Sequence, residues 1–144
     1  TKQTREWELM SAAGYSETPL AKKLGFKPGE LLWASGMPAS VKQMLDAEAH
    51  PRYLARPTKV LAAAHIFHTS AKQLEAELEA LRLKLAPDGM VWVSWPKKAA
   101  KLETDITEDT IRRIALPMGY VDVKVCAVDE IWSGLKLVIR KTLR

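Results

Sequence analysis

Apolar runs along the chain predict the strands of a covered sheet. Residues 60–68 and 90–95 are apolar at nearly every position, which is typical of parallel strands that helices cover on both faces. A shorter apolar run at 31–34 predicts another buried strand, and 53–56, just before Pro57, fits a short edge strand. These runs indicate a sheet whose two faces are both buried.

Between the apolar runs, the hydrophobic spacing changes to the period of an α-helix. We expect Thr18, Ser70 and Asp105 to be N-cap residues. Gly25 is expected to end the first helix in the left-handed conformation, and a Pro-Asp-Gly turn at 87–89 to follow the third. The helices predicted in this way cover residues 20–24, 39–48, 70–85 and 105–118.

The end of the chain has the period of two that half-buried strands show. Apolar and polar residues alternate over 121–127 and again over 135–140, on either side of a short loop, which predicts an antiparallel hairpin. Helices and strands alternate before it. The fold class we predict is therefore α/β, with three layers and a mostly parallel sheet that ends in the hairpin. The layout is similar to a shortened Rossmann fold of the class I methyltransferase type, because only residues 36–59 separate the first strand from the long apolar one.

Length and composition limit the domain count and the compartment. The 144 residues suit one domain, which we expect over 14–144, with 1–13 a leader or flexible N-terminus. The single cysteine, Cys126, cannot form an intramolecular disulfide or a cysteine-cluster metal site, and a reducing, cytoplasmic location is the simplest expectation. No apolar run is long enough to span a membrane.

Four segments resemble a known bacterial family. Two of them are distinctive, Trp-Pro-Lys-Lys at 95–98 and Asp-Glu-Ile-Trp-Ser-Gly at 129–134. Together the four resemble the bacterial family called domain of unknown function 3052. The resemblance implies a small bacterial cytosolic protein and brings no established activity or catalytic residues. The segments are 14–25, 85–98, 104–109 and 124–135.

A nucleotide or S-adenosylmethionine site has a weak signature in this sequence. Such a site uses a glycine-rich turn after the first strand and an acidic residue after the second. Here the turn at 34–38 contains only Gly36, and Arg56 stands where the acid is expected. We therefore expect no cofactor.

Two lysines after the 90–95 strand form the best candidate site. Open α/β sheets bind ligands at the carboxyl ends of their strands, and two ammonium groups there suit a phosphate or carboxylate. The helix start near Thr107 offers further donors. The hairpin loop either lines the same crevice or only shapes the turn, with its tryptophan packed on the sheet. The candidate ligand-binding residues are Lys97, Lys98, Thr107, Asp129, Glu130, Trp132 and Ser133.

The histidines and the cysteine offer little catalytic chemistry. His65 and His68 are three residues apart on a strand and so point to opposite faces, which argues against a shared metal. His68, at the strand end, has the chemistry of a general base. No nucleophile stands beside it in the sequence, and Cys126 is expected to be inert packing. We therefore assign no catalytic residues and no metal ligands.

Three functions remain open from the sequence. The preferred one is a non-catalytic Rossmann-like binding or interaction domain, whose partner is an anionic small molecule or another protein. The first alternative is a divergent S-adenosylmethionine-dependent methyltransferase-like enzyme. The second is weak, non-specific nucleic-acid binding, which the net charge of +5 permits but the 7% aromatic content disfavours.

Overall fold

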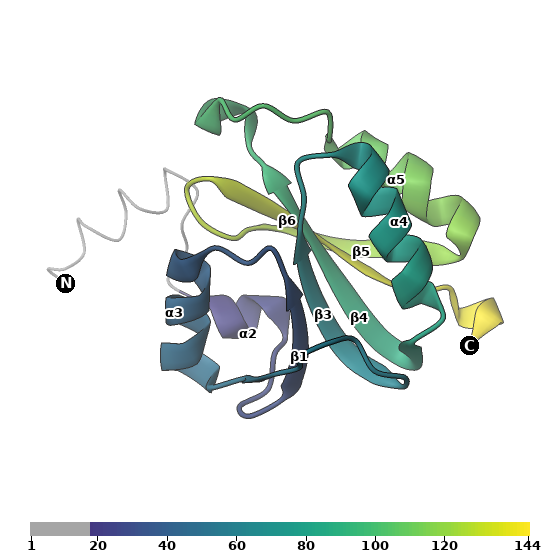
Figure 1. The fold of residues 1–144 in the computed structure, drawn as a ribbon, viewed down its shortest axis with the longest axis horizontal. Helices are drawn as coiled ribbons and strands as arrows, with labels where there is room; N and C mark the ends of the chain where they lie inside the picture. The colour runs from purple at the N-terminus through teal and green to yellow at the C-terminus, as the bar shows by residue number, and fades with distance from the viewer. Residues whose placement is uncertain (1–17) are drawn as a thin grey trace, which may run out of the picture.

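The computed structural model describes residues 18–144 (Figure 1), so the leader predicted at 1–13 lies outside the described residues. Short 3-10 turns, η1 (Lys98–Ala100), η2 (Leu116–Met118) and η3 (Lys141–Leu143), join or end the larger elements. In chain order these are α2 (Leu20–Leu24), β1 (Leu31–Ser35), α3 (Ala39–Ala49), β2 (Arg52–Tyr53), β3 (Leu61–Phe67), α4 (Ala71–Arg82), β4 (Leu85–Pro96), α5 (Glu108–Ala115), β5 (Tyr120–Ala127) and β6 (Trp132–Ile139).

The strands form one six-stranded sheet in the order β2-β1-β3-β4-β6-β5. β1 pairs in parallel with β2 and β3, and β3 pairs in parallel with β4. β6 lies between β4 and β5 and is antiparallel to both. The mostly parallel sheet with a C-terminal hairpin is therefore confirmed.

Helices cover both faces of the sheet and complete three layers (Figure 1). On one face, α2 and α3 bury a cluster that includes Leu24, Leu45 and Trp92. On the other, α4 and α5 bury a larger cluster that includes Leu78 and Ile111. The Trp92 indole N–H donates to the carbonyl of Leu24 over 2.7 Å, which fastens α2 to the middle of the sheet. No helix of the described chain is both long and apolar enough to cross a membrane.

Two strand boundaries differ from the prediction. β4 begins at Leu85, and the segment predicted as a turn at 87–89 is a bulge within it, where residues 86–89 lie opposite Ala62 of β3. The prediction failed because Pro-Asp-Gly favours both turns and bulges, and only pairing with β3 distinguishes them. The edge strand is Arg52–Tyr53 and not 53–56, since the chain leaves the sheet edge early to reach β3.

Helix ends were predicted with mixed success. Ser70 caps α4, accepting the backbone N–H of Gln73 over 3.3 Å, and Gly25 ends α2 with φ 79°. Thr18 and Asp105, however, are not N-caps of the helices that follow them. Pro19 occupies that position in α2.

In α5 the N-cap is Thr107, whose hydroxyl accepts the Thr110 N–H over 3.2 Å while the Thr110 hydroxyl accepts the Thr107 N–H. Asp105 instead accepts the backbone N–H of Ala71 over 2.7 Å, at the start of α4. The sequence offers two possible N-caps for α5, Asp105 and Thr107. Thr107 occupies the position, because the Asp105 carboxylate is bonded to the start of α4.

Candidate functional site

The carboxyl ends of β1 and β3 meet where the strand order reverses. From β1 the chain crosses through α3 to β2 on one side, whereas β3 and β4 continue on the other. Ligands of open α/β sheets bind at such a switch point. Gly36 follows β1 with φ 68°, and a Cβ there would lie 2.9 Å from the carbonyl oxygen of Phe67. Only glycine allows the backbone to turn this closely over the end of β3.

The first turn of α3 opens onto the same edge. Its N-cap is Pro38, which has no polar side-chain atom to cap the helix. The first intrahelical bond runs from the Lys42 N–H to the Pro38 carbonyl, over 3.0 Å. The three N–H groups before it, those of residues 39–41, have no partner within the helix. Together with the helix dipole, they favour a negatively charged group.

A carboxylate reaches this edge from α4. Glu77 accepts the Trp33 indole N–H over 3.1 Å, and its other oxygen lies 2.6 Å from His68 Nε2. Trp33 belongs to β1 and His68 follows β3, so this Glu77 cluster (Trp33, His68 and Glu77) joins three elements at the switch point. The side chains of His68 and Glu77 are only 12% and 18% exposed, so water screens the pair little.

The cluster keeps Glu77 ionised. Burial acts to raise the pKa of Glu77, but hydrogen bonds from His68, Trp33 and Ser35 outweigh it and lower that pKa. An ionised carboxylate accepts hydrogen bonds, so His68 carries its proton on Nε2. In the tautomer with its proton on Nε2, the other ring nitrogen, Nδ1, carries a lone pair.

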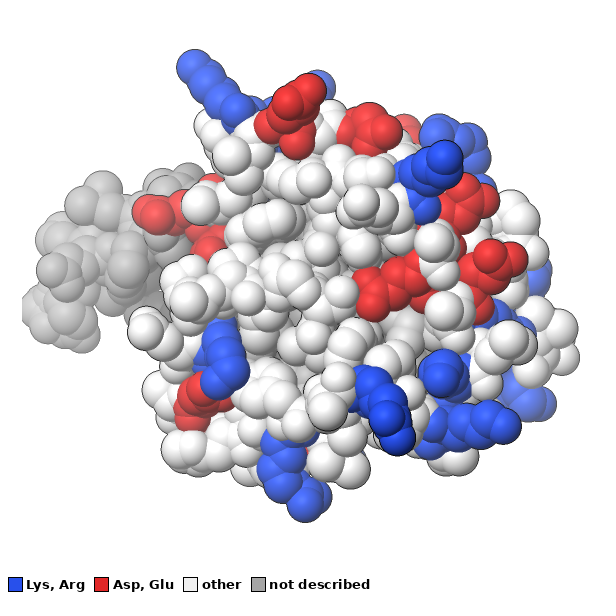
Figure 2. Space-filling view, viewed as in Figure 1, with Lys and Arg blue, Asp and Glu red and all other residues white. Residues whose placement is uncertain are grey.

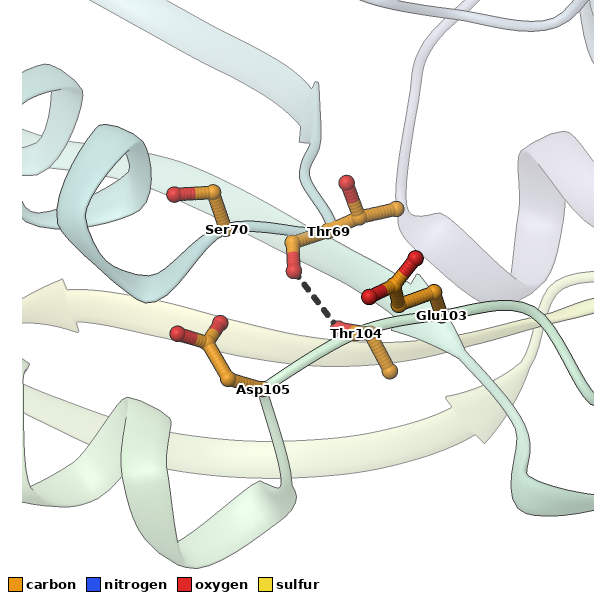
Figure 3. A pocket seen from close by; sticks show the side chains of 5 residues that line it. All are labelled: Thr69, Ser70, Glu103, Thr104 and Asp105. Carbon is orange, nitrogen blue, oxygen red and sulfur yellow. Dashed lines mark hydrogen bonds between the residues drawn. The ribbon is translucent and has the colours of Figure 1, made fainter.

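A polar hollow of about 400 Å³ is lined by Thr69 and Ser70, which follow His68 in the chain, and by the loop before α5. In Figure 3 the Thr104 hydroxyl donates to the carbonyl of Thr69, over 2.8 Å, and this bond holds the loop before α5 against the end of β3. Glu103 and Asp105 also line the hollow (Figure 3). Their two carboxylates disfavour an anion in this part of the edge.

The predicted lysines line a second hollow, of about 450 Å³, at the end of β4. Lys97, Lys98 and Thr107 all contribute to it, as the sequence analysis expected of one site. Thr107 uses its N–H and a lone pair of its hydroxyl to cap α5, and the same hydroxyl lies 2.9 Å from that of Thr110. The two hollows share Thr104 and are therefore neighbours on the carboxyl edge.

The sequence left two roles open for the hairpin loop, to line the crevice beside the lysines or only to shape the turn. In the structure the loop shapes the turn. Asp129 accepts the N–H groups of Ile131 and Trp132, over 2.9 and 2.8 Å, and so shapes the turn. The Trp132 ring packs edge-on against Phe67, with ring centroids 5.1 Å apart, on the α2–α3 side of the sheet.

The second hollow, lined by Lys97 and Lys98, lies on the α4–α5 side of the sheet, against Trp95 and Ile106. The Trp132 side chain therefore takes the other alternative, packed on the sheet, and does not line this hollow. Only the loop backbone approaches, where the Lys97 N–H donates to the Ile131 carbonyl over 2.8 Å. Glu130 is exposed, and Ser133 pairs with Trp95 in the β4–β6 ladder.

His65 lies on the face opposite the Glu77 cluster. Its Nε2 is 2.8 Å from the Ser94 hydroxyl, and its buried Nδ1 has no partner among the described residues. Burial lowers the pKa of His65 to about 3. Within residues 18–144 no three His, Cys, Asp or Glu side chains stand close enough together to hold a metal. Burial also raises the pKa of the half-buried Cys126 thiol.

Sequence reasoning missed Glu77 and Trp33. In the sequence Glu77 stands between two other glutamates of α4, Glu75 and Glu79, both of which are exposed. It is nevertheless half-buried, because it lies between Leu74 and Leu78 at the border of the apolar stripe and faces β1. The sequence pattern carries no signal for this, since the partner Trp33 is 44 residues away.

Charges on the molecular surface are mixed in sign. On the face in Figure 2, acidic side chains gather over the region of α4 and α5, and basic ones follow the lower edge, which carries the amino ends of the parallel strands. Other basic side chains lie at the top of the same view, so positive charge is present at both edges of this face (Figure 2).

Comparison with known proteins identifies the fold. No protein-family model matches the sequence, and no curated protein matches it. A SAM-dependent methyltransferase from Aquifex aeolicus matches with a TM-score of 0.60 and 14% identity, over 83% of this chain and 87% of that one.

A TehB-like SAM-dependent methyltransferase from Corynebacterium glutamicum matches with a TM-score of 0.52 and 10% identity, over 96% and 97%. A third match is the 1,6-didemethyltoxoflavin-N1-methyltransferase of Burkholderia thailandensis, with bound S-adenosylhomocysteine, at a TM-score of 0.53 and 13% identity, over 84% and 75%.

The chain thus has the fold of the class I SAM-dependent methyltransferases, an α/β Rossmann-like fold with a mixed sheet of six strands. At these identities the likeness establishes the fold.

Proposed function

We propose that this chain is a divergent S-adenosylmethionine-dependent methyltransferase that binds its cofactor at the β1–β3 switch point. One arrangement supports the proposal. The Gly36 turn and the uncapped start of α3 lie beside the His68–Glu77 pair, on a fold that methyltransferases share. An anion site and a proton acceptor thus meet at one edge.

The chain fits one end of the cofactor better than the other. The first-turn N–H groups of α3 suit the carboxylate of the methionine part, and Gly36 lets backbone approach it closely. The ribose end has no acidic partner in the usual place, because Leu54, Ala55 and Arg56 follow β2. This departure makes the proposed protein divergent, and it predicts weak cofactor binding.

The bound cofactor supplies an activated methyl group, and the protein's contribution is to handle the proton of the acceptor. Glu77 holds the Nε2–H of His68, which orients the ring and leaves Nδ1 as the base. We propose that Nδ1 takes a proton from a nitrogen or oxygen nucleophile. Glu77 is a positioning residue that stabilises the resulting imidazolium.

Titration calorimetry with S-adenosylmethionine and S-adenosylhomocysteine tests the proposal. We expect both to bind with a Kd of roughly 10 to 300 μM, a range set by the missing ribose partner. Ser40→Asp places a carboxylate in the exposed first turn of α3, where it competes for the same N–H groups. It should stabilise the helix yet weaken cofactor binding about tenfold or more.

Ala47→Asp is the matched control, because it adds the same charge to the same helix near its other end, at another exposed position. It should leave the Kd within about twofold of wild type. Absence of heat at millimolar cofactor, with the protein folded, would contradict the proposal. Equal weakening by the two variants would contradict the placement at α3.

The second candidate is the non-catalytic binding domain of the sequence analysis. The absence of an acid after β2 favours it, since a Rossmann-like scaffold without a cofactor needs none. It predicts no binding of either cofactor form, so the same calorimetry distinguishes the two functions.

We also propose membership of the domain of unknown function 3052 family, a bacterial origin and a reducing, cytoplasmic location, with residues 14–144 as one domain. The support is the Trp-Pro-Lys-Lys segment at 95–98, the Asp-Glu-Ile-Trp-Ser-Gly segment at 129–134 and the lone Cys126. Calibrated gel filtration and limited proteolysis test the domain assignment, which expects a protected fragment that starts near Gly14.

A further inference from the structure

The hollow at the carboxyl end of β4 is built from an apolar wall and a basic rim. Trp95 and Ile106 form its floor and are 8% and 2% exposed, and Leu102 projects beside them at 47%. Lys97 and Lys98 stand at the strand end above this floor. A volume of about 450 Å³ is within the range of small-molecule sites.

The two lysines are available to a ligand. In the described part of the chain, neither ammonium group has a carboxylate within 4.0 Å or a hydrogen-bond acceptor. The position of Lys97 is nevertheless fixed, because its backbone N–H bonds to the carbonyl of Ile131 in the hairpin loop. The Lys98 backbone belongs to η1, which follows directly.

The other polar groups of the hollow are already engaged. The Thr104 hydroxyl donates to the Thr69 carbonyl and accepts the Ile106 N–H, and the Thr107 hydroxyl caps α5. The one acid in the lining, Glu108, is paired with Arg112. Recognition of a polar ligand group therefore falls to the two lysines.

We propose that this hollow binds a small organic anion, a carboxylate attached to a flat or branched apolar body. The body lies on Trp95, Ile106 and Leu102, and the carboxylate meets Lys97 and Lys98. The floor accounts for the apolar body, since buried aromatic and aliphatic walls bind little that is fully polar. The site lies at the end of β4 and is independent of any cofactor at the β1–β3 switch point.

The test uses 1-naphthoate as the probe, with 1-naphthylmethylamine as a probe of the same body and opposite charge. Binding is followed by backbone NMR shifts of the wild-type protein. We expect 1-naphthoate to shift the signals of residues 95–107 with a Kd of roughly 0.1 to 1 mM, and the amine to bind at least about tenfold more weakly.

Two variant pairs separate a local site from general attraction to a basic protein. Lys97→Gln with Lys98→Gln should weaken naphthoate binding about tenfold or more. The exposed pair Lys59→Gln with Lys141→Gln removes the same charge elsewhere and should change the Kd by less than about twofold. Leu102→Ala trims the apolar wall at an exposed position and should weaken binding about threefold.

Each adverse outcome overturns the proposal. No shift at 5 mM naphthoate would show that the hollow takes no such anion. Equal binding of the amine, or equal weakening by the two lysine pairs, would show that Lys97 and Lys98 do not recognise the charge. Because no cofactor is present, these outcomes stand apart from the calorimetry that tests the methyltransferase proposal.

Discussion

The buried histidine of β3 should make the protein sensitive to mild acid. The pKa of His65 is about 3 in the folded chain, against an ordinary value of 6.5, and the cause is burial. The ring lies among Phe26, Phe67 and Ser94, with centroids 6.0 and 4.4 Å from the two phenylalanine rings. Among residues 18–144 no charged partner of the His65 ring compensates an imidazolium there.

Proton linkage gives the direction in which the free energy of unfolding changes with pH. Below pH 6.5 the unfolded chain binds a proton at His65 that the folded chain does not, so stability falls as the pH falls. The slope approaches about 1.4 kcal/mol per pH unit. Between pH 8 and pH 5 the free energy of unfolding should lose about 2 kcal/mol through this residue. This window lies above the range in which carboxylates titrate.

A paired substitution isolates the effect. His65→Leu with Ser94→Ala removes both members of the hydrogen bond and leaves no orphaned group. Urea unfolding of this double variant should lose about 2 kcal/mol less than wild type between pH 8 and pH 5. Ser94→Ala alone is the control, because His65 stays buried, and it should keep the full pH slope. An equal slope in the double variant and in wild type would refute the reasoning.

Two further predictions concern single hydrogen-bonded groups. Glu77→Gln should lower the free energy of unfolding by about 2 kcal/mol at neutral pH, since it removes the negative charge to which His68 and Trp33 are hydrogen-bonded. The pKa of Glu77 is lowered in the folded state, so its contribution is present above the ordinary value of 4.5 and is lost as the pH falls from there through the folded value. The unfolding free energies of Glu77→Gln and wild type, measured by urea titration, should therefore draw together below pH 4.5, and Glu75→Gln on the exposed face should change little. A gap that does not narrow below pH 4.5 would contradict the charge effect. Trp92→Phe should cost about 2 kcal/mol in the same assay, because the buried Leu24 carbonyl loses its donor, and an unchanged urea midpoint would show that this bond contributes nothing.

Elements with short-range causes were predictable from the sequence. The covered strand at 61–67, the Ser70 cap and the terminal hairpin each follow from apolar period, cap chemistry or alternation within a few residues. The carboxyl-edge position of Lys97 and Lys98 followed too, because parallel strands place their ends at one edge.

The features that the sequence did not decide depend on residues that are distant from one another in the chain. Thr107 rather than Asp105 caps α5, because the start of α4 takes the Asp105 carboxylate. The choice between the two alternatives for the hairpin loop was likewise open in the sequence, because Trp132 packs against Phe67, a residue distant in the chain. Neither partner can be identified from the local pattern.

The sequence by itself determined the order of helices and strands, the covered sheet and the hairpin, because backbone preference and burial period act over short segments. Only the tertiary structure decided which polar groups share the carboxyl edge. Glu77 meets Trp33 and His68 there because packing brings α4 across β1 and β3, and a hydrogen bond between distant residues leaves no periodic trace in a single sequence.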